Sequence, residues 1–118
     1  MAYDSNNIFA KILRGEIPCK KIFENEFALA FHDIAPEAPV HVLVVPKIKC
    51  ISFNDFAKTA TAEFMKGFFS TVQNVAESLD LPENGYRIIT NHGAYASQSV
   101  PHFHVHILGG RNLGRLLA

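Results

Sequence analysis

The chain has 118 residues, of which 48% are hydrophobic and 19% charged, and eleven Lys and Arg balance eleven Asp and Glu. This length and composition predict a single globular domain over residues 1–118, large enough to form a core without disulfide or metal crosslinks. The balanced charge excludes a global positive field, so we expect no nucleic acid or membrane partner, and any phosphate must be bound by local groups.

Targeting and redox features are also missing from the sequence. The N-terminus has no basic stretch followed by an apolar run, and no apolar segment approaches the roughly 20 residues of a membrane helix. We therefore expect a cytoplasmic protein. Cys19 and Cys50 lack the Cys-x-x-Cys spacing of redox or zinc sites, so we interpret them as spectator thiols.

The first half of the chain predicts a short helix followed by three strands. Residues 8–13 have apolar side chains at helical spacing, and Asn7 can cap this helix. Residues 21–32 contain two apolar runs around a polar turn, which predicts a β-hairpin. Residues 40–45 are rich in β-branched side chains and predict a third strand, in which His41 is the only polar residue.

The second half predicts one long helix and two further strands. Between residues 54 and 81 apolar side chains recur at intervals of three and four, which indicates one amphipathic helix. Residues 86–90 predict a fourth strand, residues 91–99 a polar loop, and the histidine-rich segment after it a fifth strand. This order predicts an α+β fold with an antiparallel sheet and with the helices on one side of it.

Three histidines alternate with apolar residues in the segment HFHVH, residues 102–106. Successive side chains of a strand point to opposite faces, so the three imidazoles share one face while Phe103 and Val105 face the core. Neighbouring imidazoles on that face are about 7 Å apart at the Cα atoms, close enough to act together on one phosphate. The preceding loop has short polar side chains and a flexible backbone that can form an anion-binding nest.

Two other interpretations of the histidines stay open. They can be core residues, although three adjacent buried imidazoles need a partner for every ring nitrogen. They can also bind zinc, for which His-x-His is a common spacing, with Asp33, His41 or His92 as a further ligand. None of these three stands at a diagnostic spacing, and imidazole is a competent nucleophile toward phosphorus, so we favour phosphate chemistry.

The triad motif followed by two apolar residues, HFHVHIL at 102–108, resembles the signature of the histidine triad (HIT) family. Other segments resemble the nucleotide-binding Hint branch of that family, in the same order and spacing. They are NIFAKI (7–12), EIP (16–18), AFHDI (30–34), APVH (38–41), VVPK (44–47) and QSV (98–100). The resemblance implies a HIT-like fold, with a five-stranded sheet, one long helix and one short helix. It also implies a homodimer in which two sheets join into a ten-stranded sheet.

The resemblance further implies hydrolysis of purine nucleoside phosphoramidates, in which AMP or GMP is linked to an amine, without a cofactor. His104 is expected to attack the α-phosphorus and carry a covalent nucleotidyl intermediate, which water releases as AMP or GMP. His102 and His106 are expected to flank the nucleophile and bind phosphate oxygens. His41 is expected to complete the proton network.

The remaining expected roles fall outside the triad. Ser99 matches a residue that hydrogen-bonds the leaving amine, and Asn91 and Gln98 match residues that contact phosphate or ribose. Asp33 matches a carboxylate that accepts the two ribose hydroxyls. An apolar purine pocket is expected from Phe9, Ile12, Phe31 and Ile34.

Two departures from the family pattern modify these expectations. Metal-binding members carry Cys-x-x-Cys near the N-terminus, where this chain has Asn7 and Ala10, so we expect no metal. The chain ends in GGRNLGRLLA rather than in a Trp-Pro-Pro type tail, which leaves the leaving-group preference open. The alternatives are a dinucleoside polyphosphate hydrolase of the same family and a nucleotide-responsive interaction protein.

Overall fold

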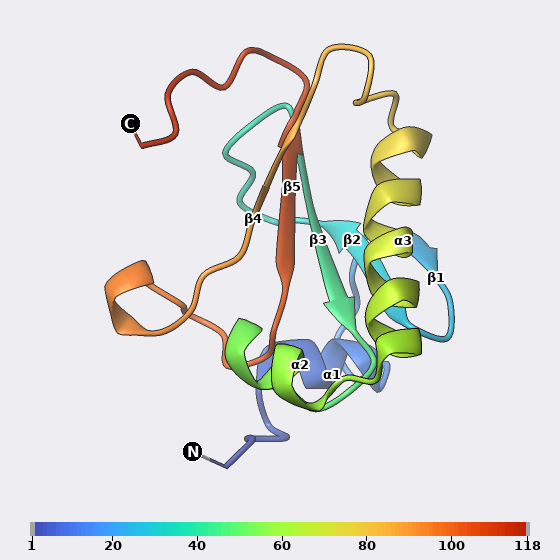
Figure 1. The fold of residues 1–118 in the computed structure, drawn as a ribbon, viewed down its shortest axis with the longest axis vertical. Coiled ribbons are helices and arrows are strands. Elements are labelled where there is room, and N and C mark those ends of the chain that lie inside the picture. Colours follow the sequence, from blue (N-terminus) through green and yellow to red (C-terminus); the bar gives the residue numbers. More distant parts are fainter. Residues whose placement is uncertain (1, 118) are drawn as a thin grey trace.

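A five-stranded antiparallel sheet forms the centre of the fold (Figure 1). The computed structural model describes residues 2–117, so the two terminal residues of the predicted domain lie outside the described part. The strands are β1 (Lys21–Glu24), β2 (Ala28–His32), β3 (Val40–Pro46), β4 (Arg87–Ile89) and β5 (Val105–Gly109). Their order across the sheet is β1-β2-β3-β5-β4, and every neighbouring pair is antiparallel. The predicted α+β class and sheet are confirmed.

The long helix predicted over residues 54–81 is divided into two. The helices are α1 (Ile8–Leu13), α2 (Phe53–Thr59) and α3 (Ala62–Ser78), with a 3₁₀ turn η1 at Ala94–Ala96. Ala60 is extended, with ψ of 138°, and the Thr61 side chain accepts from the N–H of Phe64 as the cap of α3. This cap starts a new helix where the apolar periodicity alone indicates continuity. Within residues 2–117 no helix is both long and apolar enough to cross a membrane.

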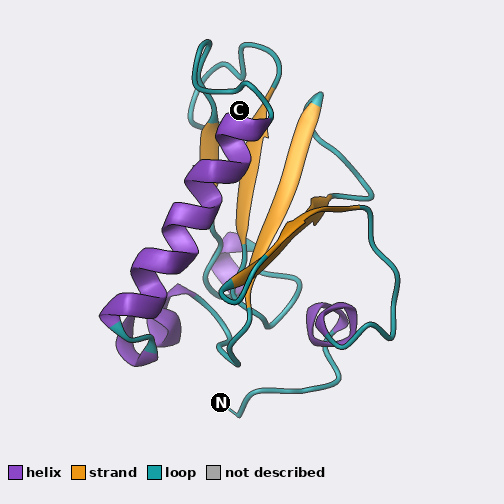
Figure 2. Cartoon of the chain, turned by 90° about the vertical axis from the view of Figure 1, so that its right-hand side faces the viewer, coloured by secondary structure: helices purple, strands orange, loops and turns teal. Residues whose placement is uncertain are grey.

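Helices cover both faces of the sheet, whereas the sequence predicted one. On one face α2 and α3 pack over small and branched side chains of the strands, including Ala30, Val44 and Ile107. On the other face Phe9 of α1 packs with Phe31 and neighbouring apolar residues of β2 and β3. Figure 2 shows α1 on the side of the sheet away from α3. The nearly continuous apolar runs of β2 and β3 are typical of strands buried on both faces.

The histidine segment runs into β5, the strand between β3 and β4. β5 begins at Val105, three residues later than the histidine segment predicted. The alternation still holds, because Phe103 and Val105 belong to the core beneath α3. The rings of His104 and His106 lie 5.1 Å apart, and His104 contacts Phe9 on the α1 side. The chemistry-bearing side chains therefore gather on the face that α1 partly covers.

Candidate active site

His104 has the geometry of a nucleophile. Its Nδ1 lies 2.7 Å from the main-chain carbonyl oxygen of His102. A carbonyl only accepts hydrogen bonds, so Nδ1 carries the proton and Nε2 keeps its lone pair. Burial lowers the pKa of His104, which keeps the ring neutral at pH 7. Nε2 is thereby available to attack an electrophile.

A chain of hydrogen bonds sets the protons of His41 and His106. The backbone N–H of Glu37 donates to Nδ1 of His41 at 3.0 Å, so a neutral His41 carries its proton on Nε2. That Nε2 lies 2.9 Å from Nδ1 of His106 and donates to it. A neutral His106 in turn carries its proton on Nε2. One backbone N–H therefore determines the tautomers of two imidazoles in sequence.

His106 is kept neutral by its surroundings. Burial, and then the neighbouring His104 and His41, lower the pKa of His106 to about 4. Its ring stands beside the ring of His104, with the centroids 5.1 Å apart. A neutral His106 with its proton on Nε2 can donate a hydrogen bond to an oxygen of a group bound beside His104.

Asp33 lies next to this histidine pair. Its Oδ2 is 3.4 Å from Nε2 of His41, and its Oδ1 accepts from the N–H of Ala35 at 2.8 Å. The carboxylate is thus held at the edge of the site, beside the Nε2–H of His41. Its predicted contact with ribose hydroxyls stays a prediction.

Asp33, His41 and His106 also resemble a metal site, because one ligand atom of each lies within 4.8 Å of the others. The hydrogen bonds of His41 argue against metal binding by these three residues. The Glu37 N–H occupies Nδ1 of His41, so the nitrogen that faces the other two groups carries a proton. A metal would have to displace that proton and leave an imidazolate, or break the bond to Glu37. The arrangement favours proton transfer over metal binding.

Both ring nitrogens of His102 are engaged within the protein, and its predicted contact with phosphate oxygens stays a prediction. Its Nε2 lies 3.0 Å from the carbonyl oxygen of Pro46, and its Nδ1 lies 2.5 Å from the hydroxyl of Tyr3. The residue is 1% exposed. Since both ring nitrogens are occupied, His102 acts on the site through its carbonyl group, which binds His104.

Gln98 supports the loop before the histidines. Its Oε1 accepts from the N–H of Gly93 at 3.0 Å, and its Nε2 donates to the carbonyls of Ile51 and Val100. Both ends of the Gln98 amide bind backbone and so support the loop, and its predicted contact with phosphate or ribose stays a prediction. His92, named above as a possible zinc ligand, also ties this loop to the helices, because its Nδ1 lies 2.6 Å from the hydroxyl of Ser52, the N-cap of α2.

Asn91 and Ser99 lie at the two ends of this loop. Asn91 is half-buried and Ser99 is exposed. Within residues 2–117 no hydrogen bond engages either side chain. Both are therefore free to meet a ligand, and their predicted contacts stay predictions.

The four predicted pocket residues do not form one group. Phe9, Ile12 and Phe31 belong to the apolar cluster on the α1 face, where Phe9 packs edge-to-face on His104 with the ring centroids 4.8 Å apart. Ile34 lies outside that cluster and is 93% exposed. Phe9 thus supports the ring of His104 from within the core and is itself packed on Phe31, whereas Ile34 presents a free apolar surface beside Asp33.

Comparison with known proteins identifies the family. A family model of the HIT domain matches residues 14–113, which is most of the chain. The chain belongs to the HIT family. This assignment confirms the resemblance of the triad and the flanking segments.

Related HIT proteins match over nearly their whole length. The chain is 52% identical over 115 residues to an uncharacterized 13.2 kDa HIT-like protein of Azospirillum brasilense, covering 98% of this chain and 94% of the relative. It is 42% identical over 112 residues to the purine nucleoside phosphoramidase of Escherichia coli K12, covering 94% and 92%. A HIT family hydrolase from Clostridium thermocellum superimposes with a TM-score of 0.88 at 37% identity, covering 98% and 99%. These matches confirm the HIT-like fold.

Proposed function

We propose that this HIT protein hydrolyses purine nucleoside phosphoramidates through a covalent nucleotidyl intermediate on His104. The hydrogen bond from Nδ1 of His104 to the His102 carbonyl carries the proposal, because it leaves Nε2 as the free nitrogen of a neutral, buried ring. The 42% identity to the E. coli purine nucleoside phosphoramidase supports the substrate class.

In the first step Nε2 of His104 attacks the α-phosphorus in line with the bond to the amine. The new N–P bond forms as the P–N bond to the leaving group breaks, and the amine nitrogen takes up a proton passed to it by the hydroxyl of Ser99, which water replaces in the second step. The imidazole becomes cationic in this step. Its Nδ1–H still donates to the carbonyl of His102, whose negative end stabilises that charge.

His106 and Ser99 assist this displacement. We assign the Nε2–H of His106 to a phosphoryl oxygen, because the chain from Glu37 through His41 leaves the proton on that atom. We assign the free hydroxyl of Ser99 to the leaving amine, which needs a donor as the bond breaks.

In the second step water attacks the phosphorus of the intermediate and releases His104. The hydroxyl of that water stays on phosphorus in the AMP or GMP product. The other proton of the water balances the proton taken up by the amine. Both displacements are promoted by positioning and by charge stabilisation from imidazoles, with no step assigned to a metal.

The nucleoside is assigned to the open side of the site. Asp33 offers a carboxylate for the vicinal ribose hydroxyls, and Asn91 offers a free amide. The exposed side chain of Ile34 gives the purine an apolar contact that becomes buried on binding.

We also propose that two copies pair through β4. This strand is an edge of the sheet, and its Ile88 is 51% exposed. Antiparallel pairing of two such edges satisfies their free backbone groups and extends the sheet to ten strands. Light scattering after gel filtration should give the mass of a dimer, and Ile88→Pro, which blocks edge pairing, should give a monomer.

Steady-state hydrolysis of a fluorogenic adenosine phosphoramidate tests the proposed activity, with wild type and His104→Ala both treated with a chelator. We expect wild-type turnover to survive chelation and the variant to lose it by orders of magnitude. Absence of wild-type turnover, together with cleavage of diadenosine polyphosphate, would assign the chain to the anhydride-cleaving alternative. Loss of turnover on chelation would contradict the metal-free mechanism.

A further inference from the structure

We infer that Tyr3 is a positioning residue for the nucleophile: its hydroxyl fixes the ring of His102, and the carbonyl of His102 sets the tautomer of His104. The inference rests on the proposed role of His104. Tyr3 lies far from the triad in sequence, and its contact appears only in the folded chain.

The ring of His102 is held at both nitrogens. Pro46 offers a carbonyl to Nε2 at 3.0 Å, so Nε2 carries the proton and Nδ1 is an acceptor. The hydroxyl of Tyr3 lies 2.5 Å from Nδ1 and donates to it. Burial lowers the pKa of His102 and raises that of Tyr3, which keeps both groups in these protonation states. If the Tyr3 hydroxyl is removed, Nδ1 of His102 loses its hydrogen-bond partner. Because His102 is only 1% exposed, water does not readily replace that partner.

This ring is an important restraint because residues 102–104 precede β5 and stand outside the sheet ladder. Two backbone bonds hold the segment, from the N–H of His102 to Val100 and from the N–H of Phe103 to Cys50. The side chain of His102 adds two anchors, because its Nε2 bonds the carbonyl of Pro46 at the end of β3 and its Nδ1 bonds the hydroxyl of Tyr3. The Phe103 N–H belongs to the same peptide group as the His102 carbonyl, so its bond to Cys50 and the two side-chain anchors together orient that carbonyl toward His104.

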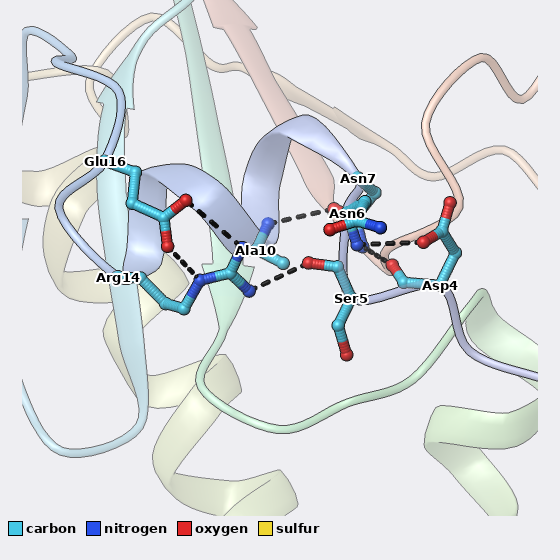
Figure 3. A network of polar contacts seen from close by, with 7 residues as sticks. All are labelled: Asp4, Ser5, Asn6, Asn7, Ala10, Arg14 and Glu16. Carbon is cyan, nitrogen blue, oxygen red and sulfur yellow. Dashed lines mark hydrogen bonds and ion pairs between the residues drawn. The ribbon is translucent and has the colours of Figure 1, made fainter.

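The segment that directly follows Tyr3 is held on α1 by a network of polar contacts, which Figure 3 shows. The carbonyl of Asp4 accepts from the side chain of Asn7, which caps α1. The guanidinium of Arg14 donates to the carbonyl of Ser5 at 2.8 Å and pairs with Glu16 at 2.5 Å. The N-terminal segment is thereby docked on α1, the helix whose Phe9 also contacts the rings of His102 and His104.

Tyr3→Phe removes only the hydroxyl, and Tyr86→Phe, at the start of the β4 region, is a matched control. Tyr3 belongs to neither core cluster, so its variant should fold. We expect Tyr3→Phe to lower kcat by about 3- to 10-fold, the effect of one hydrogen bond, with little change in KM. Tyr86→Phe should match wild type. An unchanged kcat in Tyr3→Phe overturns the inference.

The ¹⁵N chemical shifts of the imidazoles test the same inference without any substrate. In wild type we expect His102 protonated on Nε2 and His104 protonated on Nδ1. In Tyr3→Phe the Nδ1 signal of His102 should move, and the two His104 signals should approach the averaged values of mixed tautomers. Unchanged His104 signals overturn the inference even if kcat falls. If the shifts change as expected but wild type cleaves no phosphoramidate, the proposed substrate fails and the positioning role of Tyr3 stands.

Discussion

Nδ1 of His104 donates to the carbonyl oxygen of His102 across 2.7 Å, so the backbone two residues earlier leaves Nε2 as the ring nitrogen with a lone pair. In the proposed mechanism the same bond stabilises the cation that forms when Nε2 binds phosphorus. The acid–base behaviour of the site follows from this bond and from the burial of the neighbouring rings.

Activity should depend on pH through the neutral form of His104. Protonation of Nε2 removes the attacking lone pair, and burial places the pKa of His104 below the ordinary value of 6.5. We therefore expect kcat/KM to be constant near neutrality and to fall only at a pH below 6.5. The measurement is a rate profile from pH 4 to 8 at constant ionic strength. An acid limb centred above 6.5 would show that the ring is not desolvated as the structure indicates.

Stability should fall in acid because of the same burial. The pKa of His106 is about 4 in the folded chain, against an ordinary value of 6.5, so the unfolded chain binds the proton first. The neutral His106 ring therefore contributes its full stabilisation of the folded chain above pH 6.5, its ordinary pKa. This contribution is lost as the pH falls toward about 4, its pKa in the folded chain. We expect the free energy of unfolding in urea to decrease by about 1–2 kcal/mol from pH 7 to pH 5. His106→Gln should lose less over that interval, and an equal loss would count against the assignment.

The bond from Glu37 to His41 predicts different effects for two substitutions of His41. Glutamine offers one acceptor and one donor, and so can replace the ring between the Glu37 N–H and Nδ1 of His106. Leucine offers neither. We expect His41→Leu to lower kcat by about 10- to 100-fold and His41→Gln to keep most of the activity. Equal losses of kcat in steady-state assays would show that the hydrogen bonds from Glu37 through His41 to His106 do not contribute to activity.

Gly67 of α3 should resist the usual stabilising exchange to alanine. A Cβ at this position would lie 2.5 Å from the ring of Phe27, which comes from the turn between β1 and β2. We expect Gly67→Ala to destabilise the chain by about 1–3 kcal/mol through overpacking. In a Phe27→Ala background the same exchange should stabilise by about 1 kcal/mol, the helix propensity difference. Urea unfolding of the four proteins measures this reversal of sign, and its absence would contradict the packing explanation.

Much of the fold could be predicted from periodicity, since alternating and helical apolar patterns correspond directly to buried faces. The placement of Phe103 and Val105 in the core followed from alternation alone. The break at Ala60 could not be predicted in this way, because the spacing of Phe56 and Phe64 continues through it. The coverage of the second sheet face by α1 was indicated only by the continuous apolar runs of β2 and β3.

The site was predictable in its residue types and less so in its contacts. His104 and His41 stood out as polar residues within apolar strands, and the structure brings Asp33 beside His41. The bond between Tyr3 and His102 joins positions 99 residues apart, and the bond to His41 comes from a backbone N–H. No pattern of residue types signals either contact, so sequence alone assigned His102 to the phosphate.

The stereochemical course at phosphorus tests the covalent mechanism most directly. A phosphorothioamidate of adenosine with a single configuration at phosphorus is hydrolysed in ¹⁸O-labelled water, and the configuration of the product is determined. Two in-line displacements, the first by His104 and the second by water, predict overall retention. Inversion would show that water attacks the substrate directly and would contradict the nucleotidyl intermediate on His104.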